Sequence, residues 1–295
     1  MLSRVASDIK ALRIQGATNI AYASLSALRY VMSKSVKSSK SLFVKELLSA
    51  RKLLFNARPN EPMMFNALNH VINSINDYSG LDFKVYGLSV LDSLKSRVDL
   101  AKTAMTKVGA GLLKKNSVLF THCHSSSVMS IIKSAKPREV YCTESRPRYQ
   151  GRITATELIK AGLKVNMIVD SAVADYVKKA DCFLIGCDVI TSTNIINKVG
   201  SRMISILCDK YDIPLYVCSL SYKFEPGSID GFISAVEERN TKEVWDKPPR
   251  GLQIHNPAFD VVDFEAISGF ITDLGVLPPN SFINAMRQKK GKLFD

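Results

Sequence analysis

The sequence predicts an α/β protein, with an N-terminal helical domain over residues 1–112 and a second domain over residues 113–295 built on a doubly wound parallel sheet. Two observations predict this class. Up to about residue 110, apolar residues recur at three- and four-residue steps, which is the helical period. From residue 116, short apolar runs alternate with amphipathic segments, the pattern of strands and crossover helices in a parallel sheet.

The first domain contains four clear amphipathic segments. Each has apolar residues on one helical face, and we predict helices over residues 19–34, 41–57, 63–76 and 88–113. Between the first two, "SKSVKSSKS" is short and basic, which is typical of a loop or an exposed helix end. It is interpreted either as a solvated loop or as a nucleic-acid contact.

The second domain begins with strands dense in Val, Ile, Leu, Phe, Tyr and Cys, as strands covered on both faces tend to be. They are predicted over residues 117–122, 139–144, 164–170, 181–188 and 214–220. Helical spacing between them predicts helices over residues 126–136, 152–162, 171–180 and 194–212. The polar segment 225–251 then leads to residues 264–276 and 279–288, predicted as a loop and closing helices.

Composition limits the classes of function. Hydrophobic content of 46% with 23% charged residues is typical of a globular protein, and no apolar stretch reaches the ~18 residues of a membrane span, so we expect a cytoplasmic protein. The six cysteines form no CxxC pair, which favours free thiols. The net charge of +13 favours an anionic partner, either nucleic acid or a phosphorylated small molecule.

The stretch "LFTHCHSSSV" lies where a predicted strand ends, at the sheet edge where α/β proteins bind ligands. His122 and His124 suggest a metal site, but no further ligands stand at suitable spacing. Cys123 is a candidate nucleophile whose pKa a following helix N-terminus would lower. The hydroxyls of Ser125, Ser126 and Ser127 suit an anion site at that helix start. The alternative is structural, with serines that cap a helix and a buried cysteine.

Further polar residues follow the other predicted strands. Arg146 and Arg148, in "TESRPRYQGR", have guanidinium groups that suit phosphate oxygens, or they are ordinary surface arginines. Asp188 ends an apolar run, where proton transfer becomes plausible, unless it caps the next helix or pairs with a lysine. Asn197, Lys198 and Lys223 stand within reach of an anion, the first two about a turn into the predicted helix.

Taken together, these motifs resemble a known family. "THCHSSS", "TESRPRYQGRITATEL", "IVDSAV", "GCDVIT", "INKVGS" and "YKFEP" occur in the order and spacing of the family that joins ribose-1,5-bisphosphate isomerase, methylthioribose-1-phosphate isomerase and the regulatory subunits of translation initiation factor two-B. "IQGATNIA" and "ARPNEPMMFNAL" extend the resemblance to nearly the whole chain. Within this family, the pattern most resembles the archaeal ribose-1,5-bisphosphate isomerase branch.

The resemblance implies a Rossmann-like second domain, dimers formed through that domain or higher homo-oligomers, and an aldose-to-ketose isomerase. The catalytic pair would be Cys123 and Asp188, with no metal and no redox cofactor. The substrate would be a phosphorylated sugar. The substrate contacts would be Gln15, Gly16, Ala17, Thr18, Arg58, Ser125, Ser126, Ser127, Asn197, Lys198 and Lys223.

The chain departs from the isomerases at several positions. Gln15 stands where arginine is typical, His124 where asparagine is usual, and Leu220 where glutamate is frequent. The loop after Asp188 is about one residue short. A second hypothesis is therefore a non-catalytic binding protein of the initiation-factor type, with an initiation factor or RNA as partner.

Overall fold

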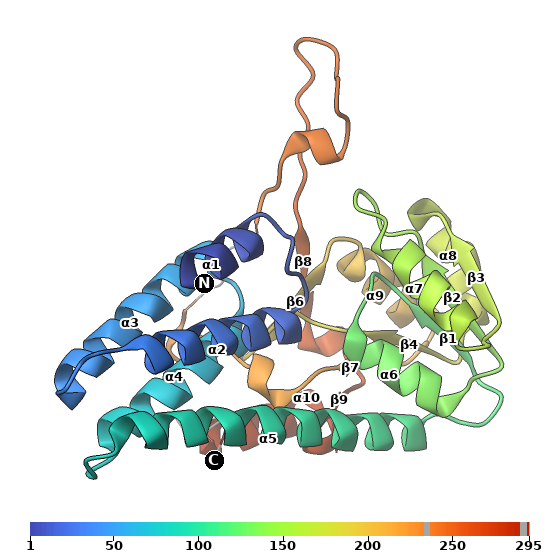
Figure 1. The fold of residues 1–295 in the computed structure, drawn as a ribbon. Helices are drawn as coiled ribbons and strands as arrows, with labels where there is room; N and C mark the ends of the chain where they lie inside the picture. Colours follow the sequence, from blue (N-terminus) through green and yellow to red (C-terminus); the bar gives the residue numbers. More distant parts are fainter. Residues whose placement is uncertain (233–236, 290–293, 295) are drawn as a thin grey trace. The chain divides into compact units, whose positions relative to one another are not determined.

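A computed structural model describes residues 1–232, 237–289 and 294 (Figure 1). The chain forms two compact units. The helical unit comprises residues 1–101, 222–224 and the described part of 289–295, and the sheet unit comprises residues 102–221 and the described part of 225–288. The predicted domain boundary after residue 112 stays a prediction.

The helical unit confirms all four predicted helices and adds a short one before them. Its helices are α1 (Leu2–Lys10), α2 (Ala17–Lys34), α3 (Lys40–Ala57), α4 (Pro62–Asp77) and the first part of α5 (Phe83–Leu112). Ser39 caps α3 by accepting a hydrogen bond from the Leu42 N–H, and Pro62 occupies the first turn of α4, where no N–H is needed. Among the described residues, no helix is both long and apolar enough to span a bilayer.

A short strap and the described residues near the C-terminus complete the helical unit. The strap is Tyr222–Phe224, and the side-chain amide of Asn66 on α4 donates to the carbonyls of Tyr222 and Phe224 at 3.0 and 2.8 Å. Phe294, 2% exposed, stacks on Tyr222 with ring centroids 4.2 Å apart. Lys223 is therefore fixed between two bonded carbonyls.

The sheet unit has a seven-stranded sheet whose order is β10-β9-β7-β4-β1-β2-β3, parallel except for the β9–β10 pair. The predicted parallel sheet is thus confirmed. Because chain order runs outward in both directions from the β1–β4 pair, the topology reverses there, and open α/β sheets bind ligands at such a point. The strands are β1 (Val118–Thr121), β2 (Glu139–Thr143), β3 (Val165–Ile168), β4 (Cys182–Ile185), β7 (Leu215–Cys218), β9 (Gly269–Thr272) and β10 (Gly275–Leu277).

Helices cover this sheet in two groups. Helix α6 (Ser126–Ala135) packs beside α7 (Gln150–Lys160), and the short α8 (Val173–Tyr176) packs beside α9 (Ser201–Lys210). The predicted helix over residues 171–180 is broken, with a 3-10 turn on each side of α8. The last helix, α10 (Pro279–Gln288), confirms the predicted one.

Two predicted helical stretches are wrong. Residues 194–200 continue no helix, because Asn194–Lys198 form strand β6 between β5 (Val189–Ile190) and β8 (Phe259–Asp263) in a second, antiparallel sheet. The buried, β-branched Ile195 and Ile196 pack better on a pleated surface. Residues 264–276 hold a 3-10 turn and then β9 and β10, which complete the edge of the large sheet.

Candidate functional site

Cys123 and Asp188 follow β1 and β4, the two neighbouring strands at which the strand order of the sheet reverses. Cys123 lies two residues beyond the end of β1 and Asp188 three beyond the end of β4, and β1 pairs with β4 in parallel. Their carboxyl ends therefore meet at one edge. The predicted catalytic pair shares one site of the sheet unit, although its role in chemistry stays a prediction.

The backbone of Cys123 is held in the left-handed region, with φ +65°. Its N–H donates to the Ser145 hydroxyl at 2.9 Å, and its carbonyl accepts from the Thr154 hydroxyl at 2.7 Å. Left-handed backbone is unfavourable for a residue with a Cβ and is found at sites held by their surroundings. The position of this cysteine is therefore fixed by specific contacts.

The Cys123 thiol is strongly perturbed. Burial raises its pKa to about 12, while a hydrogen bond from the His124 backbone and the Lys198 charge act in the opposite direction. Asp188 raises the pKa further. At neutral pH the group is therefore a thiol in the ligand-free protein, lying close enough to Lys198 and Asp188 for their charges to act on it.

The serines after Cys123 begin helix α6. Ser125 is the N-cap and accepts from the Val128 N–H at 3.5 Å, and Ser126 is the first helical residue. A Cβ at Gly186 would lie 2.4 Å from the Ser125 hydroxyl, so this glycine lets the loop after β4 approach the helix start closely. Hydroxyls and N–H groups at such a start favour an anion. Ser127 is 8% exposed.

Lys198 ends strand β6, where it pairs with Phe259 of β8. It is only 6% exposed, and burial lowers its pKa, whereas Cys123 raises it. No hydrogen-bond or ion-pair partner for its ammonium occurs among the described residues, and a buried cation without a partner is costly. Asn197, also 6% exposed, donates to the Ser201 hydroxyl at 2.8 Å. Both residues thus stand on a strand, and the prediction that they lie in a helix is wrong.

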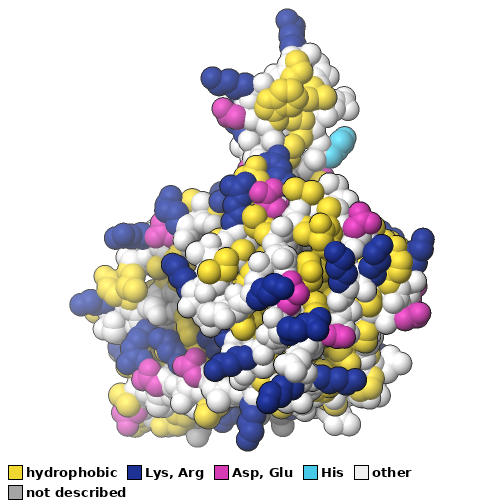
Figure 2. All heavy atoms as spheres, turned by 90° about the vertical axis from the view of Figure 1, so that its right-hand side faces the viewer, with side chains coloured by type: hydrophobic (Ala, Val, Ile, Leu, Met, Phe, Trp, Pro, Cys, Tyr) yellow, Lys and Arg dark blue, Asp and Glu magenta, His cyan; other side chains and the backbone are white. Residues whose placement is uncertain are grey.

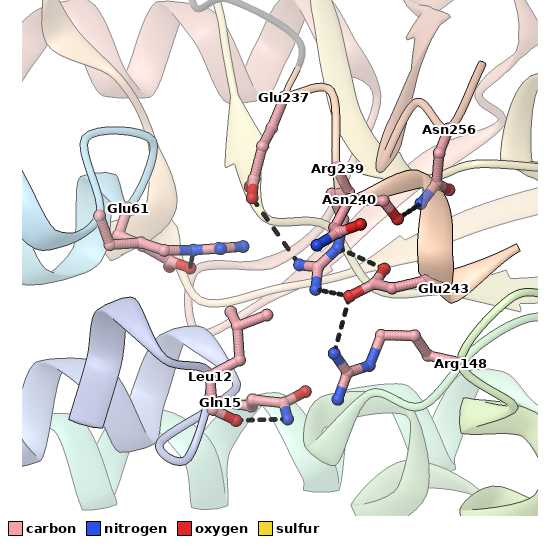
Figure 3. A network of polar contacts seen from close by, with 10 residues as sticks. Leu12, Gln15, Glu61, Arg148, Glu237, Arg239, Asn240, Glu243 and Asn256 are labelled. Carbon is pink, nitrogen blue, oxygen red and sulfur yellow. Dashed lines mark hydrogen bonds and ion pairs between the residues drawn. The ribbon is translucent and has the colours of Figure 1, made fainter. Parts of the chain in front are cut away.

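The two arginines after β2 have protein partners. Arg148 donates to Glu243 at 2.9 Å, and Arg146 donates to the Val244 carbonyl at 3.0 Å and contacts Tyr149. Arg239 binds Glu243 through two nitrogens at 2.8 and 2.5 Å, so one carboxylate serves two guanidinium groups (Figure 3). These bonds lower the pKa of Glu243 to about 2. Substrate contact by Arg146 or Arg148 stays a prediction.

Glu243 and Arg239 belong to an arm, residues 237–258, that extends from the sheet unit before β8 (Figure 1). At its base the Arg239 N–H donates to the Asn256 carbonyl at 3.0 Å, and the Ala258 N–H to the Glu237 carbonyl at 2.8 Å. The base of the arm is therefore paired backbone, further fixed by the Glu243 cluster. Arg239 and Glu243 also lie near enough to Lys198 to affect its pKa.

The remaining predicted residues belong to the helical unit. Gln15 donates to the Leu12 carbonyl at 2.6 Å, Gly16 is the N-cap of α2 with φ +83°, and Ala17 and Thr18 begin that helix. Arg58 follows α3 and pairs with Glu61 at 3.3 Å, and Lys223 lies in the strap, 8% exposed.

Sequence reasoning missed the residues that support Cys123. Thr143 and Ser145 are fully buried, and Thr154 is 1% exposed. Their one sequence signal is their place in "TESRPRYQGRITATEL", which begins at the last residue of β2. Arg152, in the first turn of α7, pairs with Glu144 at 2.6 Å.

Basic side chains are spread over the face of the molecule drawn in Figure 2 and are interspersed with acidic and apolar ones. Contact with a nucleic-acid backbone uses a continuous basic stripe or patch. The distribution on that face is not of this kind.

The chain matches the model of the "Initiation factor 2 subunit family" over residues 13–279. It belongs to this family. Among its relatives, the ribose 1,5-bisphosphate isomerase of Archaeoglobus fulgidus is 33% identical over 97% of this chain and 92% of that protein. The enzyme of the same name from Pyrococcus furiosus is 33% identical over 98% and 94%. The methylthioribose-1-phosphate isomerase of Thermoanaerobacter sp. is 28% identical over 95% and 88%.

Solved structures of this family share the fold. Translation initiation factor eIF-2B from Pyrococcus horikoshii OT3 superposes with a TM-score of 0.79 at 27% identity, covering 94% of this chain and 97% of that one. The 5-methylthioribose 1-phosphate isomerase from the same organism gives 0.78 at 25% identity, covering 97% and 87%. The family thus includes proteins named as isomerases and proteins named as translation factors.

Proposed function

We propose that the protein is an aldose-ketose isomerase that converts ribose 1,5-bisphosphate to ribulose 1,5-bisphosphate. One observation carries the proposal: a thiol, a carboxylate and a buried cation without a described partner, namely Cys123, Asp188 and Lys198, lie within electrostatic reach of one another where the sheet reverses. The relatives named ribose 1,5-bisphosphate isomerase, alike over nearly the whole chain, support the choice of sugar.

The reaction moves one hydrogen from C2 to C1 and opens the ring. Asp188 donates a proton to the ring oxygen as the bond from C1 to that oxygen breaks. Cys123, as the thiolate, takes the proton from C2 and returns it to the resulting enol at C1, while the C2 hydroxyl gives its proton back to Asp188 and becomes the C2 ketone. A direct hydride shift from C2 to C1 is the alternative, and it needs no thiolate.

The raised thiol pKa distinguishes these two routes. A thiolate base formed with a pKa of about 12 predicts a rate that rises with pH through the alkaline range, whereas a hydride shift does not. Substrate deuterated at C2 provides the direct test. Loss of deuterium to water indicates proton removal by a base, and full retention at C1 indicates the shift.

Each unit, taken by itself, holds residues proposed to bind phosphate. In the sheet unit these are Ser125, Ser126, Ser127, Asn197 and Lys198. In the helical unit they are Gln15, Gly16, Ala17, Thr18, Arg58 and Lys223. Lys198 is the best supported member, because its side chain is largely buried and a phosphate would supply the direct ion pair that it lacks among the described residues.

The deciding experiment incubates the purified protein with ribose 1,5-bisphosphate and follows ribulose 1,5-bisphosphate. We expect turnover by the wild type and its loss in Cys123→Ser, while Cys208→Ala, which changes a buried thiol of α9, retains it. No ketose from the wild type, or undiminished ketose from Cys123→Ser, rejects the isomerase.

Gln15 favours one alternative, a binding protein of the initiation-factor type, because a neutral amide replaces a typical cationic phosphate contact. That alternative requires a stable complex with an initiation factor or RNA and no turnover.

We further propose that the protein is a homodimer or a higher homo-oligomer. Sedimentation equilibrium tests this, and a mass equal to one 32.6 kDa chain rejects it.

A further inference from the structure

The proposed chemistry uses neither of the two histidines that flank Cys123. His122 is 3% exposed, and the His124 side chain is 26% exposed. Cys123 between them is held with φ +65°, where a residue with a Cβ rarely stays unless its peptide groups are bound. The directions of the hydrogen bonds around these three residues explain how that conformation is kept.

A chain of hydrogen bonds runs from the Cys123 N–H to His122. The Val199 carbonyl, 2.8 Å from His122 Nε2, can only accept, so Nε2 carries the hydrogen. Burial lowers the pKa of His122, so the ring is neutral and Nδ1 accepts from the Thr143 hydroxyl at 2.6 Å. Thr143 then accepts from Ser145 at 3.0 Å, which leaves the Ser145 oxygen to accept the Cys123 N–H at 2.9 Å.

A second, shorter chain reaches the Cys123 carbonyl. Because that carbonyl can only accept, the Thr154 hydroxyl donates to it at 2.7 Å. The Thr154 oxygen is then free to accept from His124 Nδ1, 3.0 Å away. His124 Nε2 lies 3.7 Å from Glu157. His124 keeps its Nδ1 hydrogen when Nε2 gains a proton, so this chain holds in both charge states.

We propose that His122 and His124 are positioning residues that hold the two peptide groups of Cys123 in its left-handed conformation, one through Thr143 and Ser145 and the other through Thr154. The catalytic meaning of this role rests on the proposed function. Since Val199 directly follows Lys198, the His122 chain also ties the backbone of Cys123 to the strand end that carries the buried cation. Neither histidine is an acid or a base in the reaction.

The first test removes the shorter chain without changing side-chain shape. In Thr154→Val we expect kcat to fall about tenfold or more, because the reacting group is misplaced, with KM within about twofold. Thr156→Val is the matched control, since Thr156 lies on the same helix and its hydroxyl donates to the Arg152 carbonyl at 2.7 Å. The control should retain the wild-type kcat.

A conservative rescue separates positioning from packing. His124→Leu should lose kcat as Thr154→Val does, whereas His124→Asn, whose amide N–H replaces Nδ1–H, should remain within about threefold of the wild type. The pH profile of kcat should show no transition that His124→Asn removes. Wild-type kcat in both Thr154→Val and His124→Leu overturns the proposal, as does an equal loss in His124→Leu and His124→Asn.

A second measurement needs no turnover. Cys123 is the most exposed of the six cysteines, so its alkylation by iodoacetamide can be followed by mass spectrometry of its peptide. At pH 9 we expect Thr154→Val to react about threefold or more faster than Thr156→Val, because the released thiol loses the burial that raises its pKa, which outweighs the lost Lys198 charge. Equal or slower alkylation overturns the positioning role. If the wild type makes no ketose, the isomerase is rejected while alkylation still decides the role of the histidines.

Discussion

Lys198 and Arg148 are both cations near the sheet edge, and both were predicted to hold phosphate, yet the structure treats them differently. Lys198 is 6% exposed and makes no direct ion pair among the described residues, although Glu243 and Asp188 act on it from farther away. The Arg148 side chain is 36% exposed and already pairs with Glu243. A desolvated charge costs stability unless a ligand compensates it, whereas a neutralised surface charge costs little. Burial without a partner is thus the better indication of a ligand contact.

The largest effect on activity is expected for Lys198→Met, which therefore tests the contrast between the two cations most directly. Losing a charged contact costs about 1.5–3 kcal/mol, so we expect kcat/KM to fall about 10- to 150-fold. The same change removes a largely desolvated charge that makes no direct ion pair among the described residues, so the urea midpoint of unfolding should rise. A fall in stability together with unchanged kcat/KM would mean that the ammonium has a structural partner.

Substitution of Gly200 should destabilise the turn after Lys198. Its φ is +102°, and a Cβ there would lie 2.9 Å from His122 Cε1. We expect Gly200→Ala to lower the free energy of unfolding by about 2–3 kcal/mol. Gly162→Ala is the control, because φ is +79° but nothing lies within 4 Å, so only about 1 kcal/mol should be lost. Equal losses in chemical denaturation would show that the His122 ring yields to the added methyl group.

The pH dependence of stability should reveal the buried ring beside this turn. Burial lowers the pKa of His122, so below its unfolded value of 6.5 the unfolded chain binds a proton that the folded protein does not. Stability is therefore present above pH 6.5 and is lost as pH falls, by at most about 1.4 kcal/mol per pH unit. Urea titrations between pH 7 and 5 should show a flatter slope for His122→Asn.

The smallest effect is expected for Arg148→Ala. Its exposed ion pair contributes about 0–1 kcal/mol to stability, and Glu243 keeps Arg239 as a partner. We expect KM for the bisphosphate to change by less than about threefold. A tenfold rise in KM would show that Arg148 leaves Glu243 for the substrate and would remove the contrast with Lys198.

The fold was predictable where one local signal sufficed. Buried runs such as residues 181–188 gave strands of the parallel sheet, and the helical period gave α2 to α5. The prediction failed at residues 194–198, because the apolar pair Ile195 and Ile196 fits both the helical period and the strand period locally. These residues form a strand because they pair with β8, which begins at Phe259, about sixty residues later.

The candidate site shows the same limit. Strand ends placed Cys123 and Asp188 at one edge, and the structure agrees. The hydroxyls of Thr143 and Thr154 were not predictable, because their bonds depend on a left-handed cysteine and on chain segments up to 31 residues apart. Nor does the sequence show that Glu243 pairs with both Arg148 and Arg239, since Arg148 and Glu243 are 95 residues apart.

The pairing of β1 with β4 also has a consequence for how the protein folds. Leu119 pairs with Cys182, so joining these neighbours closes a loop of about sixty residues that contains two other strands. Contacts so distant in sequence form slowly, because the entropy of loop closure is lost before the contact is gained. During synthesis, Cys123 leaves the ribosome well before Asp188 exists. The reactive edge is thus assembled late, and a nascent chain halted before residue 182 should expose Cys123 to alkylating agents.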